Sequence, residues 1–164
     1  LADLRPDLKV APLRGNVPTR LRKCKEQHFA AIILASSGLA RLEGAGLEEL
    51  DGLRQHRLRP DLFIPAPSQG ALAVQVRAED AAFEAVSALD LPLARAAADA
   101  ERAVLLALEG GCQTAIGAWL SINGERCTLY AAFEREQQLR RSSASGLVQD
   151  TDTLVKRVVE ELVA

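Results

Sequence analysis

The chain has 164 residues, of which 48% are hydrophobic and 26% charged, and its formal net charge is −2 at pH 7. This length and composition are typical of a globular protein with one good core or two small ones. The near-neutral charge gives no reason to expect nucleic acid or an anionic membrane as a partner. No apolar run approaches the roughly 20 residues that span a bilayer, and no signal peptide is visible.

Three cysteines, Cys24, Cys112 and Cys127, lie far apart in the sequence without the spacing of a metal site or of a disulfide framework. Reduced thiols and a cytoplasmic location are therefore expected, and no metal site. The sequence contains no methionine, even at position 1. We therefore expect this chain to be a piece of a longer protein.

The first segment predicts a strand, a turn and a helix. Residues 8–13 form a short apolar run, and the turn Arg14-Gly15-Asn16 follows. Asn16 is a suitable N-cap for a helix that runs through about Gln27. Such a strand–turn–helix unit directs backbone N–H groups and the positive end of a helix dipole at one point, where an anion can dock.

Basic side chains flank this point. Arg14 precedes the predicted helix and Arg20 lies in its second turn. The guanidinium fork matches a carboxylate, so these residues favour an acidic ligand. A solvated basic helix face would explain the same pattern equally well.

Residues 30–35 form a continuous apolar run, which is typical of a strand covered on both faces in a parallel sheet. A turn at 36–38 follows at the carboxyl end of this strand, where open α/β sheets bind ligands. Arg41 lies just beyond, on a short helical segment, and is either a ligand-binding or an ordinary surface arginine. Residues 43–60 predict a polar helical stretch.

Residues 61–65 and 71–76 predict two strands, joined by a turn at 66–70 that contains Gln69. Gln69 is either a hydrogen-bonding group that lines a cleft or a simple loop residue. Residues 79–89 predict an amphipathic helix.

From residue 93 the pattern predicts a compact α+β unit. Asn123-Gly124 is a strong signal for a two-residue hairpin. The expected elements are a helix over 93–108, strands over 118–122, 126–133 and 139–145, and a helix over 151–162 with Leu154, Val155, Val158, Val159 and Leu162 inward.

Two glycines and a cysteine follow the long predicted helix. Gly110 can end the helix in a left-handed conformation, and Gly111 leaves open space beside Cys112. The thiol would then lie on a short, open loop. A small buried cysteine after a capped helix is the alternative.

Three blocks in this order resemble the porphobilinogen deaminase (hydroxymethylbilane synthase) family. They are Leu-Arg-Gly-Asn-Val-Pro-Thr-Arg-Leu at 13–21, the run 65–71 with its Gln-Gly pair, and Leu-Glu-Gly-Gly-Cys at 108–112. The resemblance extends over nearly the whole chain but covers roughly the C-terminal half of a family member. Family members often carry glycine where Ser68 stands, and we expect the small serine to preserve the turn.

The resemblance implies a dipyrromethane cofactor attached to Cys112 through a thioether. This cofactor primes the stepwise deaminative condensation of four porphobilinogen units into a linear tetrapyrrole. Arg14, Arg20 and Arg41 match arginines that bind the carboxylates of the cofactor and of the growing pyrrole chain, and Gly111 and Gln69 complete the expected cofactor-binding set. The family's acid–base aspartate lies in an N-terminal part that this chain lacks, so no residue here is assigned as catalytic.

The resemblance also implies the architecture, α/β plus α+β. A partial α/β domain like that of periplasmic binding proteins precedes a small C-terminal α+β domain with a three-stranded antiparallel sheet. Residues 1–60 would belong to the second α/β domain, 61–92 would return to the first, and 93–164 would form the C-terminal domain with the cofactor cysteine.

The complete protein is expected to be a cytoplasmic, monomeric transferase of haem and tetrapyrrole biosynthesis, and the present chain is expected to be inactive alone. A non-catalytic anion-binding or interaction module that retains the fold is the alternative.

Overall fold

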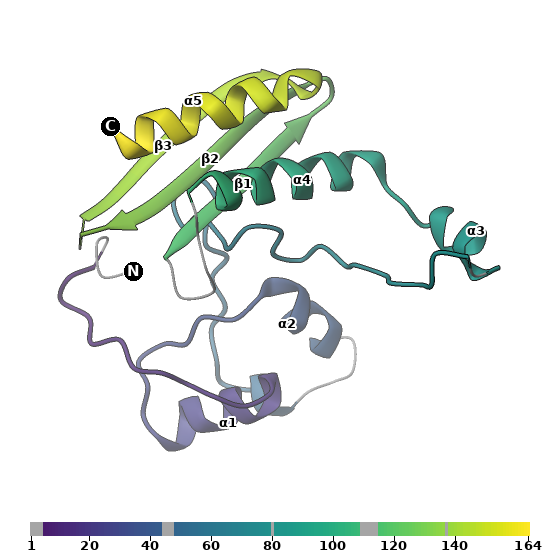
Figure 1. Cartoon of the computed structure of the whole chain (residues 1–164). Helices are drawn as coiled ribbons and strands as arrows, with labels where there is room; N and C mark the ends of the chain where they lie inside the picture. Colours follow the sequence, from purple (N-terminus) through teal and green to yellow (C-terminus); the bar gives the residue numbers. More distant parts are fainter. Residues whose placement is uncertain (1–4, 44–47, 80, 109–114, 137) are drawn as a thin grey trace. The chain divides into compact units, whose positions relative to one another are not determined.

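The computed structural model describes residues 5–43, 48–79, 81–108, 115–136 and 138–164 (Figure 1). The chain divides into two compact units, residues 1–58 and 59–164, and each is described by itself. None of the helices described has the length and apolar character needed to cross a membrane. The helices are α1 (Val17–Glu26), α2 (Ser36–Glu43), α3 (Ala82–Ser87), α4 (Pro92–Ala107) and α5 (Thr151–Val163), with short 3₁₀ turns at Glu48–Leu50 and Val148–Asp150.

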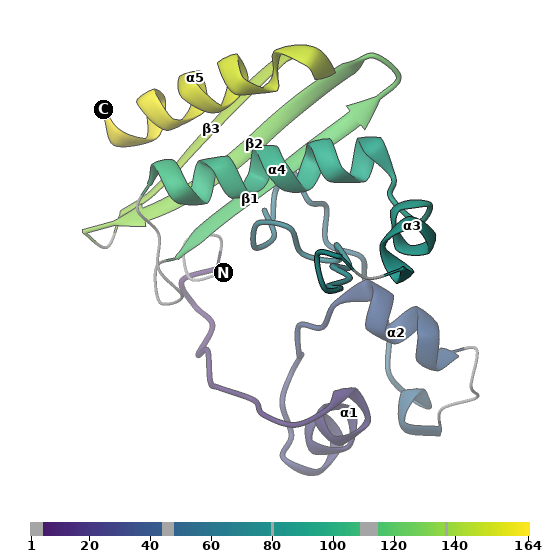
Figure 2. The same cartoon turned by 45° about the vertical axis from the view of Figure 1, so that its right-hand side comes forward.

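The second unit contains a three-stranded antiparallel sheet in the order β1-β2-β3. The strands are β1 (Ile116–Asn123), β2 (Arg126–Arg135) and β3 (Gln138–Leu147). Helices α4 and α5 lie against the same face of the sheet, as both views of the ribbon show (Figures 1 and 2). This confirms the predicted α+β arrangement of helix, three strands and helix.

The core of this unit lies between the two helices and the sheet. Val104 of α4, Leu129 of β2, and Val158 and Leu162 of α5 are completely buried. Apolar residues at helical spacing on α4 and α5 thus meet alternate residues of the strands, as amphipathic patterns require. The inward positions predicted for the last helix are confirmed, although Val159 is only half-buried at the edge of the core.

The predicted hairpin is confirmed, with its turn displaced by one residue. Asn123 is the last residue of β1 and pairs with Arg126, so Gly124 and Glu125 form the turn. Gly124 has φ +62°. A positive φ is easily adopted by glycine, which explains its place at the first turn position.

In the first unit, α1 confirms the helix predicted from Asn16 to about Gln27. The Asn16 side chain accepts a hydrogen bond from the Thr19 N–H (2.9 Å), as an N-cap does. Leu21 and Cys24 on this helix are buried. Residues 36–38, predicted as a turn, instead form the start of α2.

The strands predicted at 8–13, 30–35, 61–65 and 71–76 are wrong: no described residue before β1 belongs to a strand. A strand requires a neighbour to complete its hydrogen-bond ladder, and parallel strands acquire theirs from distant chain segments. These apolar runs have no such neighbour among the described residues, and Ile33 and Leu72 are 48% and 82% exposed. The antiparallel sheet thus accounts for all strand pairing in the residues described.

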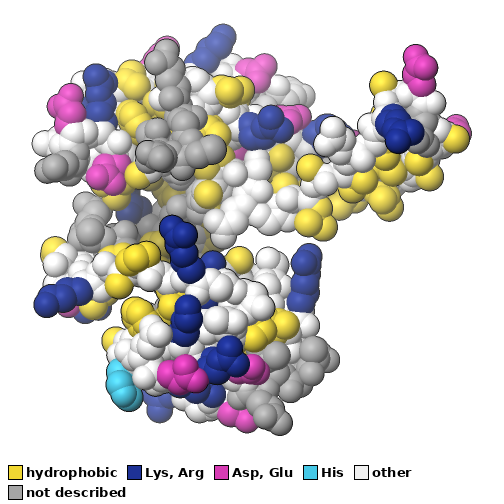
Figure 3. All heavy atoms as spheres, turned by 60° about the horizontal axis from the view of Figure 1, so that its bottom comes forward, with side chains coloured by type: hydrophobic (Ala, Val, Ile, Leu, Met, Phe, Trp, Pro, Cys, Tyr) yellow, Lys and Arg dark blue, Asp and Glu magenta, His cyan; other side chains and the backbone are white. Residues whose placement is uncertain are grey.

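Two predicted helices are also shorter than expected. Residues 43–60 contain only the end of α2 and one 3₁₀ turn among the residues described. The helix predicted at 79–89 is reduced to α3, around which hydrophobic side chains are visible at the surface (Figure 3). Phe83 and Leu89, which lie on one face of the predicted amphipathic helix, are 57% and 69% exposed. Helical periodicity stabilises a short helix only where its apolar face is covered.

Candidate cofactor-binding residues

The loop that precedes α1 is held against the helix by basic side chains. The Arg20 Nε donates to the Gly15 carbonyl (2.7 Å), and the Lys23 Nζ donates to the Arg14 carbonyl (3.1 Å). Gly15 has φ +127°, and a Cβ there would meet the Thr19 Cγ2 at 2.9 Å. The glycine is therefore required both by its backbone conformation and by the close approach of the helix.

This arrangement leaves cationic groups available at the start of α1. Arg20 uses its Nε within the loop, and no hydrogen bond from its Nη groups to a described residue is seen. The Arg14 guanidinium is exposed and has no side-chain partner among the described residues. Together with the helix dipole, these groups suit an anionic ligand, and a carboxylate matches the guanidinium fork best.

Helix α2 begins beside the start of α1. A Cβ on Gly38, in the first turn of α2, would lie 3.6 Å from the Val17 Cγ2, and Val17 is the first residue of α1. The first turns of the two helices therefore lie close together. Arg41 lies on α2 and is exposed, which is the helical position predicted for it.

In the second unit, Gln69 lies on a tight turn. The Gln69 N–H donates to the Ala66 carbonyl (3.0 Å), and the Ala71 N–H donates to the Ser68 carbonyl (3.0 Å). The Gln69 side chain is exposed, while Ser68 has φ +60° and Gly70 has φ +92°. The turn is thus preserved with serine in a left-handed conformation that glycine adopts more easily.

Glu101 of α4 binds this turn. One carboxylate oxygen accepts the Ser68 N–H (2.7 Å) and the other accepts the Leu120 N–H of β1 (2.9 Å). Glu101 is only 7% exposed, and burial raises its pKa, whereas the two N–H donors act in the opposite direction.

Sequence reasoning assigned no role to Glu101. It shares the helical face of Ala97, Ala100, Val104 and Leu108, all of which lie in or against the core. A carboxylate within such an apolar stripe is the sequence feature that could have identified Glu101, because a buried charge needs hydrogen-bond partners.

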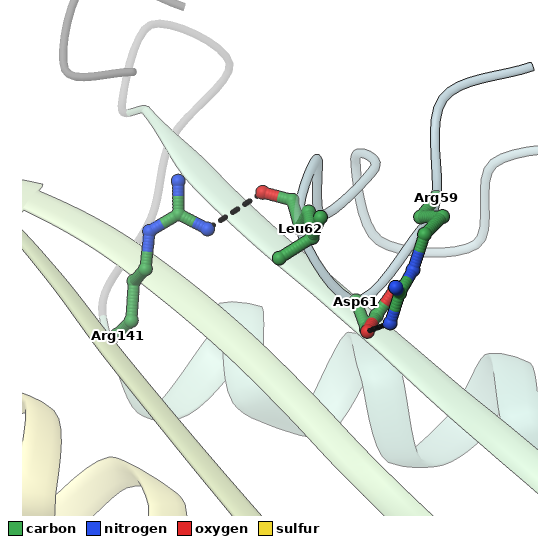
Figure 4. Close-up of polar contacts among 4 residues, drawn as sticks. All are labelled: Arg59, Asp61, Leu62 and Arg141. Carbon is green, nitrogen blue, oxygen red and sulfur yellow. Dashed lines mark hydrogen bonds and ion pairs between the residues drawn. The ribbon is translucent and has the colours of Figure 1, made fainter.

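A neighbouring segment also lies on the sheet (Figure 4). An Nη of Arg141, on β3, donates to the Leu62 carbonyl (2.7 Å), and Arg59 forms an ion pair with Asp61 (2.6 Å). The Ala118 N–H, at the free edge of β1, donates to the carbonyl of Pro65 (3.0 Å). Residues 59–68 therefore reach Gln69 along a path fixed by β1, β3 and α4.

Cys112, the predicted attachment residue, and Gly111, the cofactor-binding residue predicted beside it, lie outside the described residues. In the sequence they fall between the end of α4 and the start of β1. The other two cysteines, Cys24 and Cys127, are buried. Burial raises the pKa of the Cys127 thiol, and the Asp150 carboxylate raises it further by a smaller amount.

Lys and Arg side chains and Asp and Glu side chains are scattered over the face shown in Figure 3. Within the described part of the chain, no three His, Cys, Asp or Glu side chains gather as a metal site would require. Of the predicted cofactor-binding residues that the structure describes, Arg14, Arg20 and Arg41 present guanidinium groups and Gln69 presents an amide.

The chain belongs to the porphobilinogen deaminase family. The family model described as "Porphobilinogen deaminase, dipyromethane cofactor binding domain" matches residues 1–85, and "Porphobilinogen deaminase, C-terminal domain" matches residues 96–164. The two matches follow each other along one chain, which agrees with the three motif blocks read from the sequence.

Individual relatives bear the same name. The porphobilinogen deaminase of Roseiflexus castenholzii is 42% identical over 164 residues, which is 99% of this chain and 52% of the relative. That of Caulobacter vibrioides is 45% identical over 155 residues, 89% of this chain and 46% of the relative. A probable porphobilinogen deaminase of Methanosarcina barkeri is 45% identical over 130 residues, 79% of this chain and 39% of the relative. The chain thus spans about half the length of the curated relatives it matches.

Proposed function

We propose that this chain is the C-terminal part of a hydroxymethylbilane synthase, which joins four porphobilinogen units into a linear tetrapyrrole with release of ammonia. The observation that carries the proposal is the match of the cofactor-binding domain model, followed by the C-terminal domain model, along one chain. Activity is assigned to the complete protein and not to these residues alone, because the chain spans about half the length of its relatives and no acid–base residue is assigned within it.

The residues present fit a dipyrromethane, whose acetate and propionate arms are carboxylates. Arg14 and the Nη groups of Arg20 supply guanidinium donors at the start of α1, and Arg41 supplies another from α2. These residues would hold the cofactor and the growing chain by charge-assisted hydrogen bonds. The Nε bond to Gly15 would orient the Arg20 fork before any ligand binds.

Cys112 would hold the cofactor by a thioether, with Gly111 providing space beside it. A thiolate is a soft nucleophile, so this attachment requires no redox chemistry. The bound group would supply a pyrrole carbon on which substrate units are added. Gln69 would contribute an amide that hydrogen-bonds the ligand.

We also propose the domain organisation expected from the family: residues 1–60 in a second α/β domain of periplasmic-binding-protein type, 61–92 returning to a first, and 93–164 as the C-terminal domain. The first family model ends at residue 85 and the second begins at residue 96, which supports a division near residue 92. A cytoplasmic, monomeric complete protein is part of the same proposal.

Mass spectrometry of the complete protein tests the function. We expect a dipyrromethane adduct on the peptide that contains Cys112, and unmodified thiols on the peptides that contain Cys24 and Cys127. Cys112→Ser should abolish tetrapyrrole formation, whereas Cys127→Ala, a substitution in the sheet core, should retain it. An unmodified Cys112 in the complete protein would favour a non-catalytic anion-binding module, and turnover by Cys112→Ser would remove the role of this thiol.

A further inference from the structure

Glu101 connects three elements of the second unit. It lies on α4, accepts the Leu120 N–H of β1 with one oxygen and accepts the Ser68 N–H of the 66–70 turn with the other. Helix α4 and strand β1 are the elements that precede and follow the predicted attachment residue Cys112 in the chain. One carboxylate therefore ties the turn that bears Gln69 to both of them.

A buried carboxylate is a costly way to fill a place in a core. Its charge must leave water, and its hydrogen-bond partners must make up the loss. Packing alone would be served better by an apolar residue, as at Val104 one turn further along α4. The feature that an apolar residue could not provide here is the pair of main-chain contacts at 2.7 and 2.9 Å.

Ser68 is held at two points. Besides its N–H bond to Glu101, its Oγ donates to the Ala98 carbonyl of α4 (3.2 Å). Its backbone has φ +60°, a left-handed conformation that is unfavourable for a non-glycine residue. The two contacts with α4 offset this cost, so α4 imposes the conformation of the residue that directly precedes Gln69.

We propose that Glu101 is a positioning residue that fixes Gln69 relative to α4 and β1, the elements that flank Cys112 in the sequence, by holding the Ser68 N–H. The inference deepens the proposed function and rests on it, because Gln69 is a ligand-binding group only within that function. Glu101 touches neither substrate nor cofactor in this role and acts through the turn.

Amide hydrogen exchange in the complete protein tests the mechanical part without reference to activity. Glu101→Ala removes the acceptors of both N–H groups, so exchange at Ser68 and Gln69 should accelerate about 10-fold. Glu161→Ala, which removes an exposed carboxylate of the same domain, should leave the turn unchanged. Unchanged protection of the turn in Glu101→Ala would overturn the proposal.

Steady-state kinetics with porphobilinogen tests the functional part. We expect Gln69→Ala and Glu101→Ala each to raise KM about 10-fold, with a smaller change in kcat. The double variant should be no worse than Gln69→Ala alone, since both changes act on one group. Multiplied effects, or a normal KM in either single variant, would overturn the proposal.

A destabilised control separates positioning from general stability. Val155→Ala creates a cavity in the same core and should lower the melting temperature while leaving KM unchanged. A matching rise of KM in Val155→Ala would show that lost stability explains the Glu101 effect. The Cys112→Ser experiment stands apart from all of these: if Cys112 proves essential while the double variant is additive, only the positioning role fails.

Discussion

Ile64 lies so close to Gly117 that a Cβ on the glycine would come within 2.9 Å of the Ile64 carbonyl oxygen. The next residue, Pro65, accepts the N–H of Ala118 at the free edge of β1. An exposed strand edge is a site for unwanted pairing, and here a chain segment covers it. The glycine is what permits that segment to approach the strand.

Gly117→Ala should therefore destabilise the second unit by about 1–3 kcal/mol, because the clash is with backbone and a side-chain rotation cannot relieve it. Urea unfolding followed by fluorescence is suited to the measurement, since Trp119 is the only tryptophan and stacks on Tyr130 in the same sheet. Gly146→Ala is the matched control: its nearest neighbour is the Leu154 side chain, which can move, so the loss should be smaller. Equal losses of unfolding free energy in the two variants would show that the segment around Ile64 can move away from β1 at little cost.

Leu129→Ala should destabilise the same unit by about 2–5 kcal/mol, because this completely buried side chain would leave a cavity between sheet and helices. Leu106→Ala makes the same chemical change on α4, where the side chain is 75% exposed, and should change the unfolding free energy by less than about 0.5 kcal/mol. The urea midpoint measures both. Similar midpoints for the two variants would contradict the packing of the core.

Asn16→Ala should loosen the start of α1, since it removes the acceptor of the Thr19 N–H. A lost N-cap costs about 1 kcal/mol, which corresponds to roughly fivefold faster exchange of the Thr19 amide. Asn16→Asp retains an acceptor oxygen and adds a negative charge at the positive end of the helix, so it should preserve protection. Unchanged exchange in Asn16→Ala would mean that the cap contributes nothing to the loop that carries Arg14.

The elements that the sequence predicted well are those stabilised by neighbours in the chain. Helices α1, α4 and α5 have local caps or apolar stripes, and the β1–β2 hairpin has a glycine turn. The residues that form the hydrogen bonds of each element are therefore close to one another in the sequence. The runs 30–35 and 71–76 are different. A strand pattern indicates only that the segment needs a neighbouring strand, without identifying that neighbour. No described residue pairs with these two segments.

The candidate site divides in the same way. The position of Arg20 follows from the Asn16 cap and the helical repeat, so its place on α1 could be predicted. The contact of Glu101 with Ser68 spans 33 positions and depends on how α4 packs, which no local pattern specifies. Ser68 and Gln69 could be recognised as a turn, but the partner that holds the turn could not be identified.

Glu161 should contribute stability that is lost in acid. The Ser142 hydroxyl (2.6 Å) and then Arg157 (3.2 Å) lower its pKa by hydrogen bonds to the charged form. The contribution is present above the unfolded glutamate pKa of about 4.3 and disappears as the pH falls through the lower folded value. The melting temperature of Glu161→Gln should lie below that of the parent chain at pH 7 and approach it in strong acid. A gap that widens on acidification would contradict this.

Glu101 should behave in the opposite sense. Burial raises its pKa and outweighs the N–H donors of Leu120 and Ser68, so the folded protein disfavours the charged form. The contribution of Glu101 to the stability of the folded protein is fully present below a pH of about 4.3, the pKa of an unfolded glutamate. It is lost as the pH rises through the pKa of Glu101 in the folded protein. Carboxyl NMR titration should place the midpoint of Glu101 above about 4.3, the pKa of an unfolded glutamate, and the midpoint of Glu161 below it. The reverse order would mean that the two N–H donors outweigh burial, and that the carboxylate of Glu101 stabilises the junction of α4, β1 and the Gln69 turn most strongly when charged.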